Sequence, residues 1–430
     1  MLPGNRFKKI SLMIVLIIFS WVIPAHAEEA AKINLADTAW IMVSSALVML
    51  MLPGLSLFYG GLVRRKNVLS TIMQSFVPLG VITIQWVFIG YSLSFGEDIG
   101  KFIGGLDKAF LMGMDMNTVN GTIPAYLFCM FQLMFAIITV ALISGGIAER
   151  IDFKAYVVFI FVWSTIVYDP ICHWVWGGGW LGDMGALDFA GGTVVHISSG
   201  VAALAAALAL KTRKGFPGRL MIPHSLPLTL LGAGLLWFGW FGFNAGSALG
   251  ANESAVLAFT NTQIATGAGM LGWMGVEFFK MGKASALGAA SGVVAGLVAI
   301  TPAAGFVEPL WAMVIGFVAG AICYGAVIVK MRMGYDDSLD AFGIHGVGGI
   351  WGALATGLFV TVGGTGMLAG NLSQVGVQLV GIVASAVYSF IVTYGLVMVI
   401  EKTIGFRVDD ESEEMGLDNS QHGETGYNLV

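Results

Sequence analysis

Long apolar runs recur along almost the whole chain, and each is about as long as a helix that crosses a bilayer, which needs roughly 17–25 residues. Charged residues make up 11% of the sequence and hydrophobic residues 57%, whereas about 25% of the residues in a soluble domain are charged. A chain with so little charge cannot cover a water-facing surface, so a set of soluble domains is excluded. We predict an all-α polytopic membrane protein with eleven transmembrane helices. The predicted helices lie near residues 39–61, 69–94, 122–147, 153–173, 190–210, 225–245, 255–279, 284–301, 305–329, 343–363 and 374–400.

The amino terminus has the composition of a secretory signal peptide. Basic residues at positions 6, 8 and 9 precede a short apolar core, Ile10–Ile23, and a small-residue site, Ala25–Ala27. This order is typical of a segment that directs export and is then removed. We therefore predict a signal peptide over residues 1–27, a transmembrane domain over 28–400 and a tail over 401–430. An uncleaved first span is the alternative.

Lys and Arg residues are distributed unequally between alternate loops. If the mature amino terminus lies outside, fifteen of these residues fall in inside loops and three in outside loops. Cytoplasmic loops of membrane proteins carry such an excess of positive charge. We therefore place the multi-pass chain in the cytoplasmic (inner) membrane of a bacterium, with the mature N-terminus outside and the C-terminus in the cytoplasm. The acidic tail, 401–430, has the composition of a solvated end.

Two histidine-bearing spans suggest that the chain is built from two halves of opposite orientation. Asp188 precedes His196 in the fifth span, and Asp340 precedes His345 in the tenth. Five spans per half make the second half enter the membrane from the other side, which is the pattern of an inverted repeat. We predict a 5+5 inverted repeat followed by one final helix. Asp188 and Asp340 are expected to cap their helices as structural supports, because a carboxylate there accepts hydrogen bonds from free N–H groups.

His196 and His345 are the main candidates for function. Ionisable side chains inside a membrane span are costly and rare, and both histidines stand among glycines that leave room for a neighbour. Their matching positions in two inverted halves predict a role along a transport pathway. A metal site needs three or four ligands, and no cysteine or carboxylate cluster accompanies the histidines at that depth. We therefore expect no metal and no cofactor.

Residues near the outer ends of several spans suit a small cation. Trp176 stands in a glycine-rich outer loop without Lys or Arg, where its ring face can attract a positive charge. Ser247, at the outer end of the sixth span, adds a hydroxyl acceptor. Phe135 and Phe243 are placed to narrow a pore below such a site. Packing is the alternative for each aromatic residue, because most tryptophans of membrane proteins serve as interface or packing residues.

Four segments, in order along the chain, carry a family resemblance: Pro53–Leu62, Gly185–His196, Trp240–Ser247 and Asp340–Gly346. In these segments the chain resembles the ammonium transporter (Amt/Mep/Rh) family, and specifically its bacterial Amt branch. The resemblance covers essentially the whole mature chain. It implies a homotrimer with one narrow pore in each protomer and no enzyme activity. It also implies a PII-type nitrogen regulatory protein as a cytoplasmic partner, and no nucleic acid is expected.

The resemblance further implies where ammonium, or its analogue methylammonium, is captured. The outer ammonium site would fall on Trp176, Ser247 and Phe135. Phe135 and Phe243 would form a gate below that site. The captured ion would lose a proton there, because a cation pays a large desolvation cost in an apolar constriction and neutral ammonia pays far less.

Below the gate, the resemblance implies a pore with twin histidines, His196 and His345. Phe131, Gln132 and Trp240 would be pore-lining residues. Ammonia would pass beneath the imidazoles, with or without a proton that the pair relays. The sequence is compatible both with net ammonia transport and with net ammonium transport.

Three other functions remain open at this stage. An ammonium sensor or receptor with little flux would need the same pore and the same tail. Another inverted-repeat ion-coupled transporter would need a carboxylate near the middle of the membrane, and the sequence places none there. A membrane enzyme with two catalytic or metal-binding histidines would need further ligands or acids close by.

Overall fold

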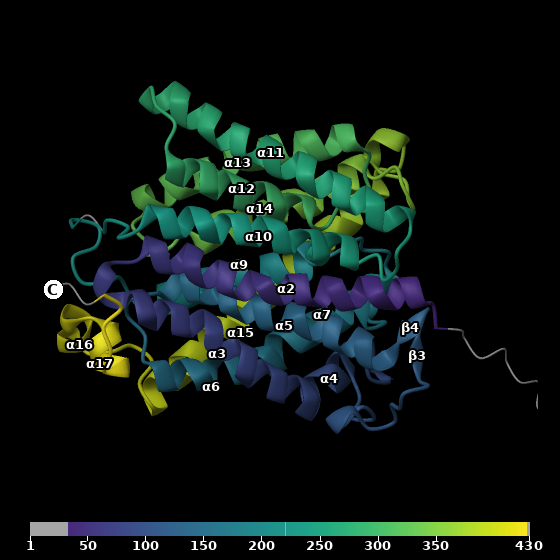
Figure 1. The fold of residues 1–430 in the computed structure, drawn as a ribbon, viewed down its shortest axis with the longest axis horizontal. Helices are drawn as coiled ribbons and strands as arrows, with labels where there is room; N and C mark the ends of the chain where they lie inside the picture. Colours follow the sequence, from purple (N-terminus) through teal and green to yellow (C-terminus); the bar gives the residue numbers. More distant parts are fainter. Residues whose placement is uncertain (1–32, 220, 428–430) are drawn as a thin grey trace, which may run out of the picture.

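The computed structural model describes residues 33–219 and 221–427 of the chain. The predicted signal peptide, residues 1–27, lies outside the described residues. The described chain forms a bundle of long helices that run side by side along its longest axis (Figure 1). Short loops, hairpins and helical turns connect these helices. The prediction of an all-helical membrane protein is therefore confirmed for this part of the chain.

The first half of the described chain forms five helical stretches, and three of them contain a wider, π-helical segment. Such segments are rare and occur frequently at functional sites. The five stretches are α2 (Leu35–Leu62); α3 (Val68–Gln85) with π-helical η2 (Trp86–Gly90) and α4 (Tyr91–Phe95); α5 (Ala125–Ile147); α6 (Phe153–Trp163) with π-helical η4 (Ser164–Tyr168), α7 (Asp169–Trp176) and α8 (Trp180–Asp183); and π-helical η5 (Gly192–Ile197) with α9 (Ser198–Ala209).

The second half continues with long helices of the same kind, one of which again begins with a π-helical segment. These elements are α10 (Leu226–Gly246), α11 (Glu253–Met281), α12 (Ala286–Ile300), α13 (Pro309–Met333), π-helical η6 (Phe342–Gly346) with α14 (Val347–Phe359), and α15 (Ser373–Thr403). Nine helical stretches within the described residues are long and apolar enough to cross a membrane. Of the other two long helices, α12 has only 15 residues and α11, with 29, is more polar.

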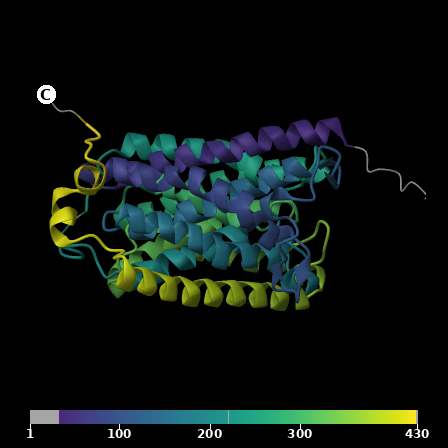
Figure 2. The same cartoon turned by 90° about the horizontal axis from the view of Figure 1, so that it is seen from below.

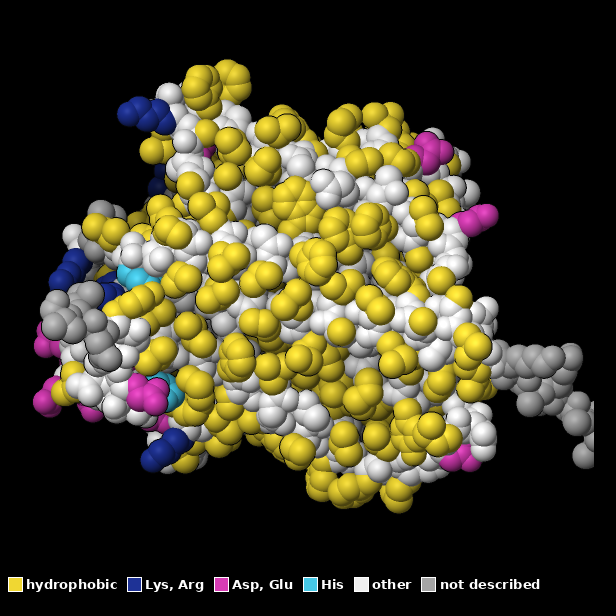
Figure 3. All heavy atoms as spheres, viewed as in Figure 1, with side chains coloured by type: hydrophobic (Ala, Val, Ile, Leu, Met, Phe, Trp, Pro, Cys, Tyr) yellow, Lys and Arg dark blue, Asp and Glu magenta, His cyan; other side chains and the backbone are white. Residues whose placement is uncertain are grey.

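The two ends of the bundle are built differently. At one end, which we call the hairpin end, the segment 96–124 forms two small antiparallel hairpins. At the other, which we call the tail end, α16 and α17 fold over the ends of the long helices (Figures 1 and 2). Figure 3 shows charged side chains concentrated at the tail end and a broad hydrophobic surface in the middle. The short elements are η1 (Arg65–Asn67), β1 (Asp98–Ile99), β2 (Ile103–Gly104), η3 (Ala109–Leu111), β3 (Val119–Asn120), β4 (Ile123–Pro124), η7 (Met367–Ala369), α16 (Asp410–Met415) and α17 (Leu417–His422).

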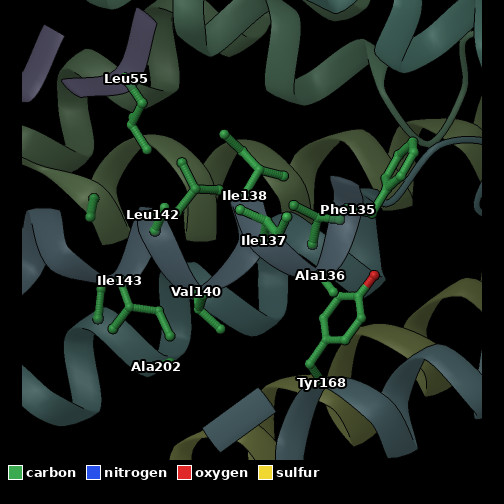
Figure 4. Packing of buried hydrophobic residues seen from close by; sticks show 14 of the residues in the cluster. Leu55, Phe135, Ala136, Ile137, Ile138, Val140, Leu142, Ile143, Tyr168 and Ala202 are labelled. Atoms are coloured by element: carbon green, nitrogen blue, oxygen red, sulfur yellow. The ribbon is translucent and has the colours of Figure 1, made fainter. Parts of the chain in front are cut away.

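Burial separates central from peripheral helices. The most apolar windows of α5 and of η5–α9 are both 83% buried, whereas that of α15 is only 28% buried. Figure 2 shows α15 along one edge of the bundle. Inside, Ile138 and Leu142 of α5 belong to one buried cluster with Leu55 of α2 (Figure 4). Two of the helical stretches that carry candidate functional residues, α5 and η5–α9, therefore lie in the centre of the bundle.

Glycines let the two histidine-bearing helices touch. A Cβ atom added at Gly200 of α9 would lie 2.6 Å from the Cα of Gly346, and one at Gly349 of α14 would lie 3.1 Å from the Cβ of His196. Main-chain atoms cannot move aside as a flexible side chain can, so a larger residue at the first contact would push the helices apart. Small residues at helix contacts allow this close approach in membrane proteins. The approach brings His345 within reach of His196.

The acidic tail is folded against the tail end of the bundle. The backbone N–H of Leu417 donates to Oδ1 of Asn67 (2.8 Å), and that of Ser70 donates to Oδ1 of Asp418 (2.8 Å). The tail is therefore attached to the bundle at Leu417 and Asp418, although its composition is that of a solvated end. Composition alone could not show this, because the partners of the tail lie about 350 residues earlier in the chain.

A buried ion cluster lies at the tail end, next to the tail. Arg213 pairs with Glu149 (2.7 Å) and Asp336 (2.8 Å), and Arg150 pairs with Asp336 (2.6 Å). Burial opposes ionisation of Glu149 and Asp336, but the neighbouring guanidinium groups outweigh it and hold the pKa of both carboxyls below the usual range. The cluster therefore ties three loops together while its carboxylates stay ionised.

Candidate functional site

The imidazoles of His196 and His345 lie against each other in the centre of the bundle. Their Nδ1 atoms are 3.3 Å apart, and their ring planes are inclined by 20°. Both side chains are almost completely buried. Each comes from a π-helical segment, His196 from η5 and His345 from η6. Residues 149 positions apart in the sequence thus form one site.

The contact between the two Nδ1 atoms limits the protonation states of the pair. In a hydrogen bond between two neutral rings, one Nδ1 carries a proton and the other accepts it. The donating ring then has an accepting Nε2, and the accepting ring has an Nε2–H. The Nε2 atom of His196 is buried and has no hydrogen-bond partner among the described residues. The neutral pair therefore offers one acceptor and one donor to a small molecule beside it.

A very small cavity lies beside the histidines. Its volume of about 10 Å³ is close to the minimum that holds one water molecule, roughly 10–15 Å³. Apart from the two imidazoles and the indole of Trp240, its walls are aliphatic or phenyl groups. The lining residues are Met51, Leu55, Phe58, Ile138, Leu142, His196, Leu236, Trp240, Phe243, Val294 and His345.

Aromatic rings form a continuous series from the hairpin end to the histidines. Trp176 contacts Phe135 with ring centroids 5.9 Å apart, and Phe135 contacts Phe243 at 4.4 Å. Phe243 in turn stacks on His196 at 5.9 Å, and Trp240 stacks on the same imidazole at 5.4 Å. The two phenyl groups thus stand between the surface and the imidazole pair, as the sequence analysis expected for a gate.

A larger cavity opens above these phenyl groups at the hairpin end. It has a volume of about 310 Å³ and contains no charged side chain in its wall. The Oγ–H of Ser247 donates to the carbonyl oxygen of Phe243 (2.9 Å), so the lone pairs of this hydroxyl remain available. The amide oxygen of Gln132 is buried without a partner among the described residues. The lining residues are Phe95, Phe128, Gln132, Phe135, Val175, Trp176, Phe189, Ser247 and Leu249.

All three residues expected at this cavity line it, and so does Gln132, which was expected along the pore. Phe131 does not line it and instead packs edge-on against Phe135, with ring centroids 5.0 Å apart. Phe95, Phe128 and Phe189 line it without having been expected. No local pattern marks these three, because they belong to separate segments that meet only in the fold.

Asp188 holds the first turn of the helix that carries His196. Its two carboxylate oxygens accept hydrogen bonds from four successive backbone N–H groups, at distances from 2.6 to 3.0 Å, in residues 191–194. Its own carbonyl oxygen accepts from Nε1 of Trp176 (2.9 Å). The carboxylate therefore acts as the expected structural support and has no oxygen left for a substrate. Gly191 makes this turn possible with a φ of 110°.

The helix that carries His345 is capped by a different residue from the one expected. Asp337 accepts hydrogen bonds from the N–H groups of Ala341 (3.0 Å) and Phe342 (2.8 Å), whereas Asp340 pairs with Lys330. Asp340 has a φ of 63°, which turns its side chain away from the helix start. The expectation that Asp340 caps this helix is therefore wrong. Asp337 precedes His345 by eight residues, the spacing between Asp188 and His196.

The environment of Asp337 leaves its carboxyl group titratable. Burial raises the pKa of Asp337 to about 6; Lys330 lowers it, the Asp340 carboxylate raises it, and the two backbone donors lower it.

On the same side of the histidines, a cavity of about 390 Å³ opens toward the tail end. Phe58 lines both this cavity and the small one beside the imidazoles. Cavities therefore lie on both sides of the histidine pair.

His173 joins α7 to the first hairpin. Its imidazole is fully buried; Nε2 lies 2.9 Å from Oδ1 of Asp98, and Nδ1 lies 3.0 Å from the carbonyl oxygen of Ser94. It thereby attaches α7, and with it Trp176, to the first hairpin.

Within the described residues, no group of three or more His, Cys, Asp or Glu side chains is arranged to hold a metal ion.

A bundle of apolar helices with a narrow passage between two cavities, lined by aromatic rings and a buried histidine pair, defines a polytopic membrane protein that moves a small polar molecule. Residues 39–427 match the model of the Ammonium Transporter Family. The chain belongs to this family.

Relatives and solved structures agree with this assignment. An ammonium transporter of Aquifex aeolicus is 52% identical over 97% of this chain and 98% of the relative, and one of Bacillus subtilis is 49% identical over 92% and 99%. The crystal structure of Saccharomyces cerevisiae Mep2 matches with a TM-score of 0.84 at 39% identity, covering 88% of this chain and 90% of that chain. A structure described as a sensor Amt protein matches with a TM-score of 0.84 at 29% identity, covering 90% and 98%.

Proposed function

We propose that this ammonium transporter captures ammonium in the cavity at the hairpin end and conducts it as ammonia past the histidine pair to the tail end. The observation that carries the proposal is a buried imidazole pair in an almost closed, apolar cavity, directly behind two phenyl rings in contact with each other. A fully hydrated ion does not fit there, and a bare cation would lose its solvation without gaining a counterion. Ammonia is small and neutral.

Capture relies on Trp176, Phe135 and Ser247. The aromatic ring faces attract the positive charge, and the free lone pairs of the Ser247 hydroxyl accept a hydrogen bond from ammonium. The wall carries no Lys or Arg to repel the ion and no carboxylate to hold it permanently. This combination favours weak, reversible capture of a small cation with hydrogens to donate.

Deprotonation provides the selectivity against potassium. Ammonium and potassium are similar in size, so diameter alone does not separate them, but only ammonium can leave its charge behind. The gate of Phe135 and Phe243 separates the captured ion from the small cavity, which it enters as ammonia. There the histidine pair accepts one hydrogen bond from ammonia and donates another. The same pair can relay the released proton, in which case net ammonium crosses.

We extend the proposal to the arrangement in the membrane. Together with the nine clear spans, α11 and α12 make eleven, in an inverted 5+5 repeat with α15 as the final helix. The identical eight-residue Asp–His spacing of Asp188 and His196, and of Asp337 and His345, supports the repeat. The hairpin end faces outward and the tail end faces the cytoplasm of a bacterium, in the inner membrane, because Lys and Arg concentrate at the tail end. The signal peptide, 1–27, is removed.

The functional assembly is proposed to be a homotrimer in the bilayer, with one pore per protomer. A PII-type regulatory protein is the proposed cytoplasmic partner, and it would reach the tail-end cavity of about 390 Å³. Both proposals rest on membership of the family. Cross-linking of the protein in native membranes and co-purification with the PII-type protein test them separately.

Current on a solid-supported membrane tests the transport proposal. Proteoliposomes that contain the full chain receive concentration jumps of ammonium, of methylammonium and of potassium as control. We expect currents or flux for the first two and none for potassium. Intact ammonium binding without flux would favour the alternative of a sensor, and potassium currents of equal size would contradict selection by deprotonation.

A further inference from the structure

A second, basic cavity lies at the tail end, beside the tail-end cavity of the passage, and Arg219 lines both. Its volume is about 560 Å³. Three segments distant in the sequence enclose it: the loop that joins α2 to α3, the loop after α9, and α16 of the tail. Five of the seven residues that line it are cationic, namely Arg64, Arg65, Lys66, Lys214 and Arg219.

The positive charge of this cavity is only partly neutralised within the protein. Arg64 pairs with Glu149 (3.0 Å), yet its Nη2 atom is buried without a hydrogen-bond partner among the described residues. Arg65 and Arg219 are exposed and form no ion pair with any described residue. Lys66 donates only to neutral backbone carbonyl groups, including that of Glu413 (2.8 Å). The cavity therefore has donors that lack an anionic partner.

The two acidic residues of the wall are not equal competitors for these cations. Glu413 is buried and already accepts from Arg407 (2.7 Å) and from the backbone N–H of Lys214 (2.6 Å). Glu414 is largely exposed and pairs only with Lys214 (2.8 Å), an interaction that water screens strongly. A ligand with more negative charge can displace the Glu414 carboxylate without disturbing Glu413.

We infer that this cavity binds a phosphate-bearing anion, which bridges the loop of Arg65 and Lys66 to the loop of Lys214 and Arg219. Guanidinium groups present several N–H donors in a planar fork that matches phosphate oxygens, and a cavity of about 560 Å³ has room for a phosphate with an attached group. The basic cavity shares Arg219 with the tail-end cavity of the passage, but none of its residues lines the small cavity beside the histidines, so the inference does not depend on the proposed transport mechanism.

Two sources could supply this phosphate. Basic pockets beside the ends of membrane helices bind anionic lipid head groups, and the wall of this cavity includes the loop that joins the long helices α2 and α3. A soluble phosphate compound could enter from the water phase. The shared chemistry is a phosphate held by several cations, and the choice of probe separates the sources.

Binding to the purified, delipidated full chain in detergent tests the inference. The probes are inorganic pyrophosphate for the soluble source and dioctanoyl phosphatidylglycerol for the lipid source, with dioctanoyl phosphatidylcholine as the uncharged comparison. Affinity is measured by isothermal titration calorimetry and the number bound by native mass spectrometry. We expect saturable binding of one of the two anionic probes.

Matched variants show whether the cavity is the site. Removing two guanidinium contacts in Arg65→Gln/Arg219→Gln should weaken binding by about tenfold or more. The control Lys280→Gln/Lys283→Gln removes the same charge at exposed positions outside the cavity wall and should leave the affinity unchanged. Glu414→Gln, which removes a competing carboxylate, should tighten binding by a few-fold.

The outcomes are distinct. Saturable binding that weakens only in the Arg65 and Arg219 variant supports the inference, and the probe that binds identifies the source. Equal weakening in the control variant would mean that general surface charge binds the probe, and this overturns the inference. Absence of saturable binding by both anionic probes to the wild-type chain overturns it as well.

Discussion

The helices that carry His196 and His345 share one sequence spacing but begin in different ways. Asp188 is fixed by four backbone donors and holds the turn beneath Trp176. Asp337 has two backbone donors and a lysine nearby, and burial raises its pKa to about 6. The comparison teaches that one device, a carboxylate eight residues before a histidine, gives a rigid start at the hairpin end and a titratable start at the tail end.

We expect the largest effect on stability and transport from the removal of the Asp188 carboxylate. Asp188→Ala leaves four buried N–H groups without their acceptor, and each unsatisfied group costs about 1–3 kcal/mol. We expect a large loss of thermal stability in detergent and no measurable transport. Asp183→Ala is the matched control, because it removes an ion pair with Lys101 in which both side chains are exposed and which therefore contributes little to stability. Melting followed by size-exclusion chromatography checks this, and equal stability of the two variants would contradict the rigid start.

The histidines themselves should also differ in their effects. The imidazole of His196 stacks on Trp240, Phe243 and His345. Among the described residues, the imidazole of His345 contacts only one aromatic ring, that of His196. We expect His196→Ala to open the passage more and to lower the ammonium current by about tenfold or more, the typical worth of a positioned acid–base group being 10²–10⁴-fold. His345→Ala should reduce the selectivity for ammonium over potassium less than His196→Ala does.

Solid-supported membrane currents for ammonium and potassium measure both histidine variants. His224→Ala serves as the control, because this residue lies outside the passage and contacts the tail through Tyr427. Unchanged currents with unchanged selectivity in both pore variants would remove the histidine pair from the mechanism.

A pH experiment sharpens the contrast at Asp337. Because its folded pKa of about 6 lies above the usual value of 3.8, the folded state binds the proton more tightly than the unfolded state. Its contribution to stability is therefore fully present below about pH 4 and is lost as the pH rises through 6. Asp337→Asn should remove this loss, worth roughly 1–3 kcal/mol, so the variant gains on the wild type as the pH rises from 4 to 7. The measurement is the Tm of both proteins at several pH values in this range. If the two Tm values change with pH by the same amount, Asp337 has an ordinary pKa.

The smallest expected effect concerns capture at the hairpin end. Trp176→Leu removes a cation–π contact worth about 1 kcal/mol, so the half-saturating ammonium concentration should rise by about fivefold. The maximal rate should change little, because the gate and the histidines remain. Methylammonium uptake over a range of concentrations measures both quantities. A fall in maximal rate alone would assign Trp176 to a later step.

Much of the architecture could be predicted from local sequence. Each predicted apolar run overlaps one helical stretch, since the thickness of the bilayer fixes the length of a span. The grouping of Trp176, Ser247 and Phe135 around one cavity was implied by the family resemblance of the sequence. The π-helical segments that contain the two histidines were not predictable, as no simple periodicity encodes them.

What the sequence missed depends on contacts between distant segments. Asp337 and Asp340 both precede the same helix, and only the backbone conformation at Asp340 decides which one caps it. Similarly, the composition of the tail gave no indication that Asn67 and Ser70 would bind it. Local patterns identify elements, whereas the choice between neighbouring polar residues is made by tertiary structure.

The contact between Gly200 and Gly346 has a consequence for how such a passage can vary. Because main chain rests directly on main chain there, the separation of the two histidine-bearing helices is set by peptide geometry and cannot be adjusted by side-chain rotation. Mutations can replace the residues that line the passage one at a time, but widening the passage itself requires whole helices to shift together. The diameter of the passage is thus set by this contact between two backbones, so substitutions of single side chains change it little.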